Sequence, residues 1–197
     1  VTDDISVLVI SDLKDSLSSK AMANVKDFID RGGNMVILGE YGRSENMNRL
    51  TASLGVHFSD GVLASPNELG SPVVLRTSYT KEAVEKHPIF ARMYEWGYGV
   101  SVPTSVALDY SQVKDFEVYP VLQTGEDAWI EYETKDLVDG EFVCNAEAGE
   151  KKGVYTTLVN LKRKVGDKEQ RIVISGDSDF ITNEEFGLAR PGIEANN

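Results

Sequence analysis

A dense group of polar side chains follows a short apolar segment near the end of the chain. Asp177, Ser178, Asp179 and Asn183 come just after residues 171–174, which are rich in β-branched side chains and predict a buried strand. Carboxylate, hydroxyl and amide groups at this spacing could bind a ligand, coordinate a cation or cap a turn. Ligands of open α/β sheets bind beyond the carboxyl ends of the strands, so this position predicts a binding site.

Two more apolar runs, residues 5–10 and 35–38, predict buried strands that also end in polar residues. We expect the strand ending at Ile174 to lie beside the strand ending at Ile10, so that the loops beyond them share one hollow. The candidate ligand-binding residues all lie just past the carboxyl ends of these strands: Ser11, Asp12, Glu40, Tyr41, Arg43, Asp177, Ser178, Asp179 and Asn183.

The acidic residues among these candidates allow two interpretations. Converging carboxylates repel one another, which calls for a cation or for a nearby arginine, and Arg43 could neutralise Glu40 or Asp12. Mg²⁺ or Ca²⁺ would suit such oxygen ligands. Alternatively, Asp177 and Asp179 accept hydrogen bonds from backbone N–H groups and cap the turn and the helix that follow. Capping is the simpler interpretation, and we expect no resident metal or cofactor.

A nucleophile with a base would instead make the site catalytic. Cys144 lies in a polar stretch without a flanking glycine, unlike a nucleophile on a sharp strand-to-helix turn. The surroundings of Ser178 lack the second glycine of a Gly-x-Ser-x-Gly turn, and neither His57 nor His87 has an acidic partner at close spacing. We therefore expect no catalytic residues. The alternative is a hydrolase or amidotransferase-like enzyme that uses Ser178 or a metal-binding group of acids: Asp12, Asp177 and Asp179.

Strand, helix and strand alternate at the start of the chain. Between the strands 5–10 and 35–38, apolar residues recur at helical spacing until Gly32-Gly33 ends the helix. This βαβ unit predicts a right-handed crossover and parallel strands. Further on, residues 154–161 and the 171–174 strand are close enough to pair as an antiparallel hairpin. The pattern predicts an α/β fold: a mostly parallel, flavodoxin- or amidotransferase-like sheet flanked by helices, with a C-terminal antiparallel β extension.

The composition fits one soluble globular α/β domain over residues 1–197. A formal net charge of −12 argues against nucleic acid as a partner, because phosphate binding needs a basic face. A single cysteine excludes an internal disulfide, and no apolar run reaches the ~18–20 residues that span a membrane. Because the chain starts directly before a strand, we expect a fragment of a longer, membrane-anchored chain, with membrane contact only through missing segments.

Several landmarks occur in one order along the chain. They are Ser11-Asp12, Gly32-Gly33, the segment 50–56, His87-Pro88-Ile89, the segment 120–124 with Trp129, Lys152-Gly153, and Arg171 with Gly176-Asp-Ser-Asp-Phe180 and Asn183. The first of these resemble the class I glutamine amidotransferase-like fold. Together, over roughly residues 5–187, they resemble the gliding-motility-type auxiliary subunit of bacterial ABC transporters, an uncharacterized transport-system component.

This resemblance implies a non-catalytic extracytoplasmic, or periplasmic, domain of an inner-membrane protein. It implies that the protein works with a permease and an ATP-binding subunit, and that the domain binds a ligand or a partner protein. A small molecule, a sugar or a peptide could be the ligand. The resemblance supplies no catalytic residues.

Overall fold

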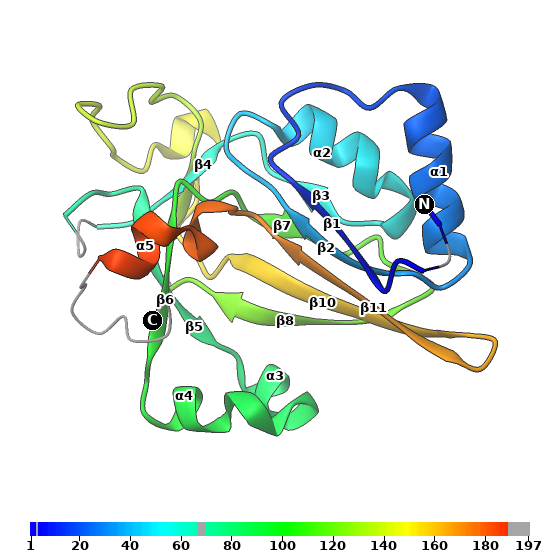
Figure 1. Cartoon of the computed structure of the whole chain (residues 1–197). Helices are drawn as coiled ribbons and strands as arrows, with labels where there is room; N and C mark the ends of the chain where they lie inside the picture. The colour runs from blue at the N-terminus through cyan, green and yellow to red at the C-terminus, as the bar shows by residue number, and fades with distance from the viewer. Residues whose placement is uncertain (3, 67–69, 189–197) are drawn as a thin grey trace.

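The computed structural model describes residues 1–2, 4–66 and 70–188, which are built around one curled, seven-stranded sheet (Figure 1). Its strands, in spatial order, are β1 (Val7–Ser11), β2 (Asn34–Leu38), β11 (Lys168–Ser175), β10 (Thr156–Val165), β8 (Glu117–Gln123), β5 (Val74–Tyr79) and β6 (Gly99–Pro103). Two small sheets pair β3 (His57–Phe58) with β7 (Leu108–Asp109) and β4 (Val62–Ala64) with β9 (Trp129–Glu131).

The helices are short and few. The α-helices are α1 (Ser19–Asp30), α2 (Ser44–Thr51), α3 (Lys81–Lys86), α4 (Ala91–Glu95) and α5 (Asn183–Gly187). Single 3₁₀ turns are η1 (Ala52–Leu54), η2 (Pro88–Phe90), η3 (Ala146–Ala148) and η4 (Asp179–Ile181). Figure 1 shows α1 and α2 on one side of the sheet and the α3–α4 segment on the other.

The predicted βαβ unit is present. Strand β1 pairs with β2 in parallel through helix α1, and the Ser18 hydroxyl caps α1 by accepting a hydrogen bond from the Ala21 N–H at 3.2 Å. Strands β10 and β11 form the predicted antiparallel hairpin, which turns at Gly166 with φ of 60°. A left-handed φ of this kind suits glycine, because glycine has no Cβ to clash with the backbone.

The sheet is less parallel than the sequence predicted. Two of its strand pairings, β1–β2 and β2–β11, are parallel, whereas the other four are antiparallel. Parallel neighbours need a long crossover connection, usually a helix, and hairpins do not. Helix α1 provides such a crossover between β1 and β2, whereas β10 and β11 are joined by a short turn and pair as antiparallel strands. The fold is a mixed α/β sheet, and a mostly parallel flavodoxin-like sheet is not evident.

The strand predicted at residues 5–10 was also expected to be buried, and that prediction is wrong. Strand β1 is an edge strand, with side chains of Val7 and Val9 that are 48% and 59% exposed. Its other face, Leu8 and Ile10, packs against the larger core. A continuous apolar run therefore misled the prediction, because an edge position leaves one face of the strand uncovered.

Two apolar cores stabilise the sheet. The larger one fills the space between α1, α2 and the strands β2, β10 and β11, around fully buried side chains such as Phe28, Met47 and Ile174. The smaller one lies around β5, β6 and β8 and includes Leu75 and Tyr119. The candidate site lies beyond the carboxyl ends of β1, β2 and β11.

Candidate functional site

Three strand ends meet at one edge of the sheet. Ser11 is in register with Leu38, and Leu38 with Ser175, so β1, β2 and β11 end level with one another. The backbone continues this ladder for one more step, because the Gly39 N–H donates to the Ser175 carbonyl at 2.8 Å. The loops that begin here carry the predicted polar residues. One detail of the prediction was wrong, since β2 lies between the strands that end near Ile10 and Ile174.

Three of the predicted residues, Glu40, Asp177 and Asp179, form a group that we call the acidic cluster. One carboxylate oxygen from each lies within 4.8 Å of the others. Glu40 is held in place by three donors: the Thr104 hydroxyl at 2.8 Å, the Ser178 hydroxyl at 3.2 Å and the Tyr41 N–H at 3.0 Å. Burial is the main reason why the pKa of Glu40 is raised above its ordinary value.

Asp177 is the most deeply buried member of the cluster, with no exposed surface. Its Oδ1 accepts a hydrogen bond from the Asp179 N–H at 2.7 Å, which is the predicted turn cap. Its Oδ2 is buried and has no hydrogen-bond partner among the described residues. Burial raises the pKa of Asp177 well above its ordinary value of 3.8, and the nearby Glu40 raises it further. Capping therefore accounts for the burial of Oδ1 but not for the burial of Oδ2.

Arg43 pairs with Asp12, one of the two acids that it was expected to neutralise. Arg43 donates through Nε to Asp12 at 3.0 Å, and Lys14 lies 3.7 Å from the same carboxylate. Asp12 is thereby paired at the border of the cluster, although its charge still contributes to a raised pKa of Asp179, for which burial is the larger cause. Asp12 also has a φ of 44°, an uncommon backbone conformation for a residue other than glycine.

The remaining predicted residues are less closely associated with the cluster. Tyr41 packs partly against the larger core. Ser11 ends β1 and Asn183 begins α5, and both are exposed. Among the described residues, no side-chain hydrogen bond joins Ser11 or Asn183 to the acidic cluster. Two participants were missed by the sequence reasoning: Thr104, which donates to Glu40, and the buried Glu185, which raises the pKa values of Asp177 and Asp179.

The groups considered for catalysis lie apart from one another. Ser178 bonds to Glu40, whereas His57 contacts the amide of Asn48 at 3.0 Å and His87 contacts the hydroxyl of Tyr119. Each histidine therefore already has a partner away from the strand ends. A serine nucleophile needs a base within hydrogen-bond reach. In the described part of the chain, the group within reach of Ser178 is a carboxylate that already accepts three hydrogen bonds.

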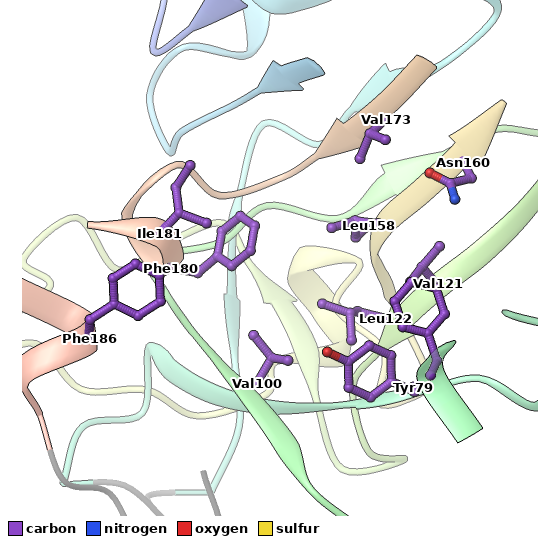
Figure 2. A pocket seen from close by; sticks show the side chains of 11 residues that line it. Tyr79, Val100, Val121, Leu122, Leu158, Asn160, Val173, Phe180, Ile181 and Phe186 are labelled. Carbon is purple, nitrogen blue, oxygen red and sulfur yellow. The ribbon is translucent and has the colours of Figure 1, made fainter. Parts of the chain in front are cut away.

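An apolar pocket of about 320 Å³ lies next to the acidic cluster (Figure 2). Its wall combines strands β5, β6, β8, β10 and β11 with the turn η4 and helix α5. In Figure 2, Phe180, Ile181 and Phe186 face Leu158 and Leu122 across the opening. The lining residues are Tyr79, Phe90, Val100, Val121, Leu122, Leu158, Asn160, Val173, Phe180, Ile181 and Phe186.

The pocket and the cluster share one element. Asp179 starts η4, and Phe180 and Ile181 complete it. Phe180 and Ile181 are apolar residues within a polar stretch of the sequence. The sequence could not reveal the rest of the pocket, because that wall is assembled from residues up to about a hundred positions away along the chain.

Fold and site together define an α/β domain with a carboxylate cluster and an apolar pocket at one sheet edge. The family model described as "ABC-type uncharacterized transport system" matches residues 1–196, and the chain belongs to this family. Membership supports a transport-associated role and a place among the auxiliary components of such systems. In the described residues, no helix has both the length and the apolar character that crossing a bilayer requires.

Structural comparison finds a similar fold in a structure titled "mmIFT52 N-terminal domain". That match has a TM-score of 0.60 and 13% sequence identity, and it covers 91% of this chain and 69% of the other. At this identity the likeness shows the fold alone. Comparison with curated proteins finds no match.

Proposed function

We propose that this chain is a non-catalytic, extracytoplasmic binding domain of an ABC-type transport system's auxiliary subunit, and that its apolar pocket takes the apolar part of a small ligand. The observation that carries the binding role is the pocket itself: about 320 Å³, lined almost entirely by apolar and aromatic side chains. Pockets of this size with few polar groups are typical of small-molecule sites. The Asn160 amide and the Tyr79 hydroxyl supply polar groups that could orient a ligand.

The proposal includes the wider assembly. A single domain, residues 1–197, would belong to a longer membrane-anchored chain and would work with a permease and an ATP-binding subunit. The family match supports membership of a transport system. The narrower likenesses, to gliding-motility-type subunits and to the amidotransferase-like fold, rest on the sequence landmarks. Fusions of the full-length protein to alkaline phosphatase test the location: activity in intact cells supports it, and an inactive, stable fusion contradicts it.

Fluorescence of N-phenyl-1-naphthylamine tests the pocket. This neutral probe brightens in apolar sites, and we expect saturable binding of one probe per domain. Phe180→Asp should abolish the enhancement, because it places a charge in the pocket wall. Val138→Asp is the matched control, since Val138 is 88% exposed and lies outside the pocket. Circular dichroism checks that both variants are folded. Equal fluorescence from the two variants would contradict the proposal.

The non-catalytic part of the proposal has a separate test. The purified domain should hydrolyse neither p-nitrophenyl acetate nor glutamine above the rate in buffer. Hydrolysis that disappears in Ser178→Ala would favour the hydrolase or amidotransferase-like alternative.

A further inference from the structure

None of the three acids of the acidic cluster lines the apolar pocket, so the pocket does not explain why these acids lie together. We propose that Glu40, Asp177 and Asp179 form a binding site for one divalent cation, with Ca²⁺ favoured by the spacing of their oxygens. This inference rests on the cluster alone and does not depend on the proposed function of the domain.

The unpartnered oxygen of Asp177 points to a missing ligand. Acidic side chains often gather on protein surfaces without binding an ion, so three neighbouring acids would not be sufficient evidence. Asp177 differs because its side chain is fully buried and its Oδ2 has no hydrogen-bond donor in the described part of the chain. Most buried polar atoms have a partner in the protein or its solvent, and one without such a partner calls for an explanation. One oxygen of its carboxylate lies within 4.8 Å of oxygens of Glu40 and Asp179, and a cation bound among these three groups would supply a partner for the Asp177 carboxylate.

The spacing of the three oxygens suits a large cation. Because they lie within 4.8 Å of one another, a point exists that is no more than about 2.8 Å from all three oxygens. Ca²⁺ bonds to oxygen at about 2.3–2.6 Å, so side-chain shifts of a few tenths of an ångström are sufficient. Mg²⁺ requires about 2.0–2.1 Å and near-ideal octahedral geometry, which is a stricter demand on three side chains from two different loops than Ca²⁺ makes.

Hydrogen bonds from neighbouring residues fix the position of the Glu40 carboxylate. Thr104 and Ser178 donate to different oxygens of Glu40, which fixes its carboxylate and leaves lone pairs free for a cation. Arg43 forms its ion pair with Asp12 and leaves the cluster's charge to another cation. Asp179 is exposed, so water can complete the six to eight ligands that Ca²⁺ takes.

A bound cation would also affect the neighbouring pocket. Asp179 is the first residue of η4, and the next two, Phe180 and Ile181, line the pocket wall. A cation that holds Asp179 against Glu40 would therefore fix η4 against the sheet. The site would act as a clamp on one wall of the pocket.

Calcium titration of the purified domain, first treated with EDTA and then dialysed, tests this site. We expect CaCl₂ to raise the melting temperature in a saturable way and calorimetry to show one ion per domain. Asp177→Asn and Asp179→Asn should each weaken binding at least tenfold. Glu45→Gln is the control, because it removes the same charge from an exposed residue outside the cluster.

Asp179 is exposed, so its variant tests the site without changing a buried group. The absence of calcium-dependent heat and of a melting shift in the parent would overturn the proposal. Binding that is equally strong in Asp179→Asn and Glu45→Gln would also overturn it, because it would show general attraction to a chain of net charge −12. Equal affinity for MgCl₂ would contradict the assignment to Ca²⁺.

Discussion

Asp177→Asn should stabilise the domain when no divalent cation is present. The Asn side chain keeps an oxygen that can accept from the Asp179 N–H, and it replaces the unpartnered Oδ2 with an N–H₂ group that can donate to a neighbouring carboxylate. Leaving a buried polar group without a partner costs about 1–3 kcal/mol. We therefore expect the free energy of unfolding at pH 7.5, in EDTA, to rise by about 1–3 kcal/mol.

The same substitution should change how stability depends on pH. The pKa of Asp177 is raised in the folded state above its ordinary value of 3.8, so the native state binds more protons than the unfolded state above that pH. The free energy of unfolding then falls as pH rises from about 4 through the raised pKa, by at most about 1.4 kcal/mol per pH unit for one group. Glu40 acts in the same direction, since its pKa is raised too.

Urea denaturation followed by circular dichroism, at pH values from 4 to 8 in EDTA, measures both effects. The advantage of the Asn variant should be smallest near pH 4, where Asp177 is protonated in the folded state and partly protonated in the unfolded state, and should grow toward pH 8. A variant that is less stable than the parent at every pH would refute the reasoning, because it would show that the negative charge itself stabilises the fold.

Three further substitutions test the packing around the site. Gly176→Ala should lower the free energy of unfolding by about 1–3 kcal/mol or more, because the added methyl would lie 2.0 Å from the Val106 carbonyl oxygen. Gly125→Ala is the control and should not destabilise the domain, because the space around Gly125 is open. Thermal unfolding compares the two variants. Gln170→Leu should cost about 1–3 kcal/mol by urea denaturation, because its amide donates to two backbone carbonyls at the end of α1. Arg43→Ala should cost under about 1 kcal/mol in the same assay, because its ion pair is partly exposed. Indistinguishable glycine variants, an unchanged Gln170 variant or a large loss for Arg43 would contradict these reasons.

The first βαβ unit and the last hairpin could be predicted because their signals are local. Gly32-Gly33 ends α1, and the short link around Gly166 lets β10 pair with β11. The position of β2 between β1 and β11 could not be predicted, because it depends on the pairing of segments more than 130 residues apart. The exposure of Val9 could not be predicted either, because the residues of β1 do not indicate whether the strand lies at an edge of the sheet.

The candidate site was predictable only in part. Acids placed after apolar strands indicated where carboxylates would gather, and Glu40, Asp177 and Asp179 do gather there. The sequence offered Glu40 and Asp12 as partners of Arg43 but could not decide between them, and the donation from Thr104 to Glu40 was missed, because both depend on loop geometry that sequence spacing does not give. The apolar pocket was missed because most of its wall comes from strand residues that read as ordinary core.

The central claim is that the pocket beside η4 binds the apolar part of a ligand. The most direct measurement is a ¹H–¹⁵N NMR titration of the labelled domain with N-phenyl-1-naphthylamine. The account predicts saturable shifts concentrated at the amides around Leu158, Val121 and Phe180, which line the pocket. Shifts concentrated instead at the exposed face of β1, around Val7 and Val9, would contradict it.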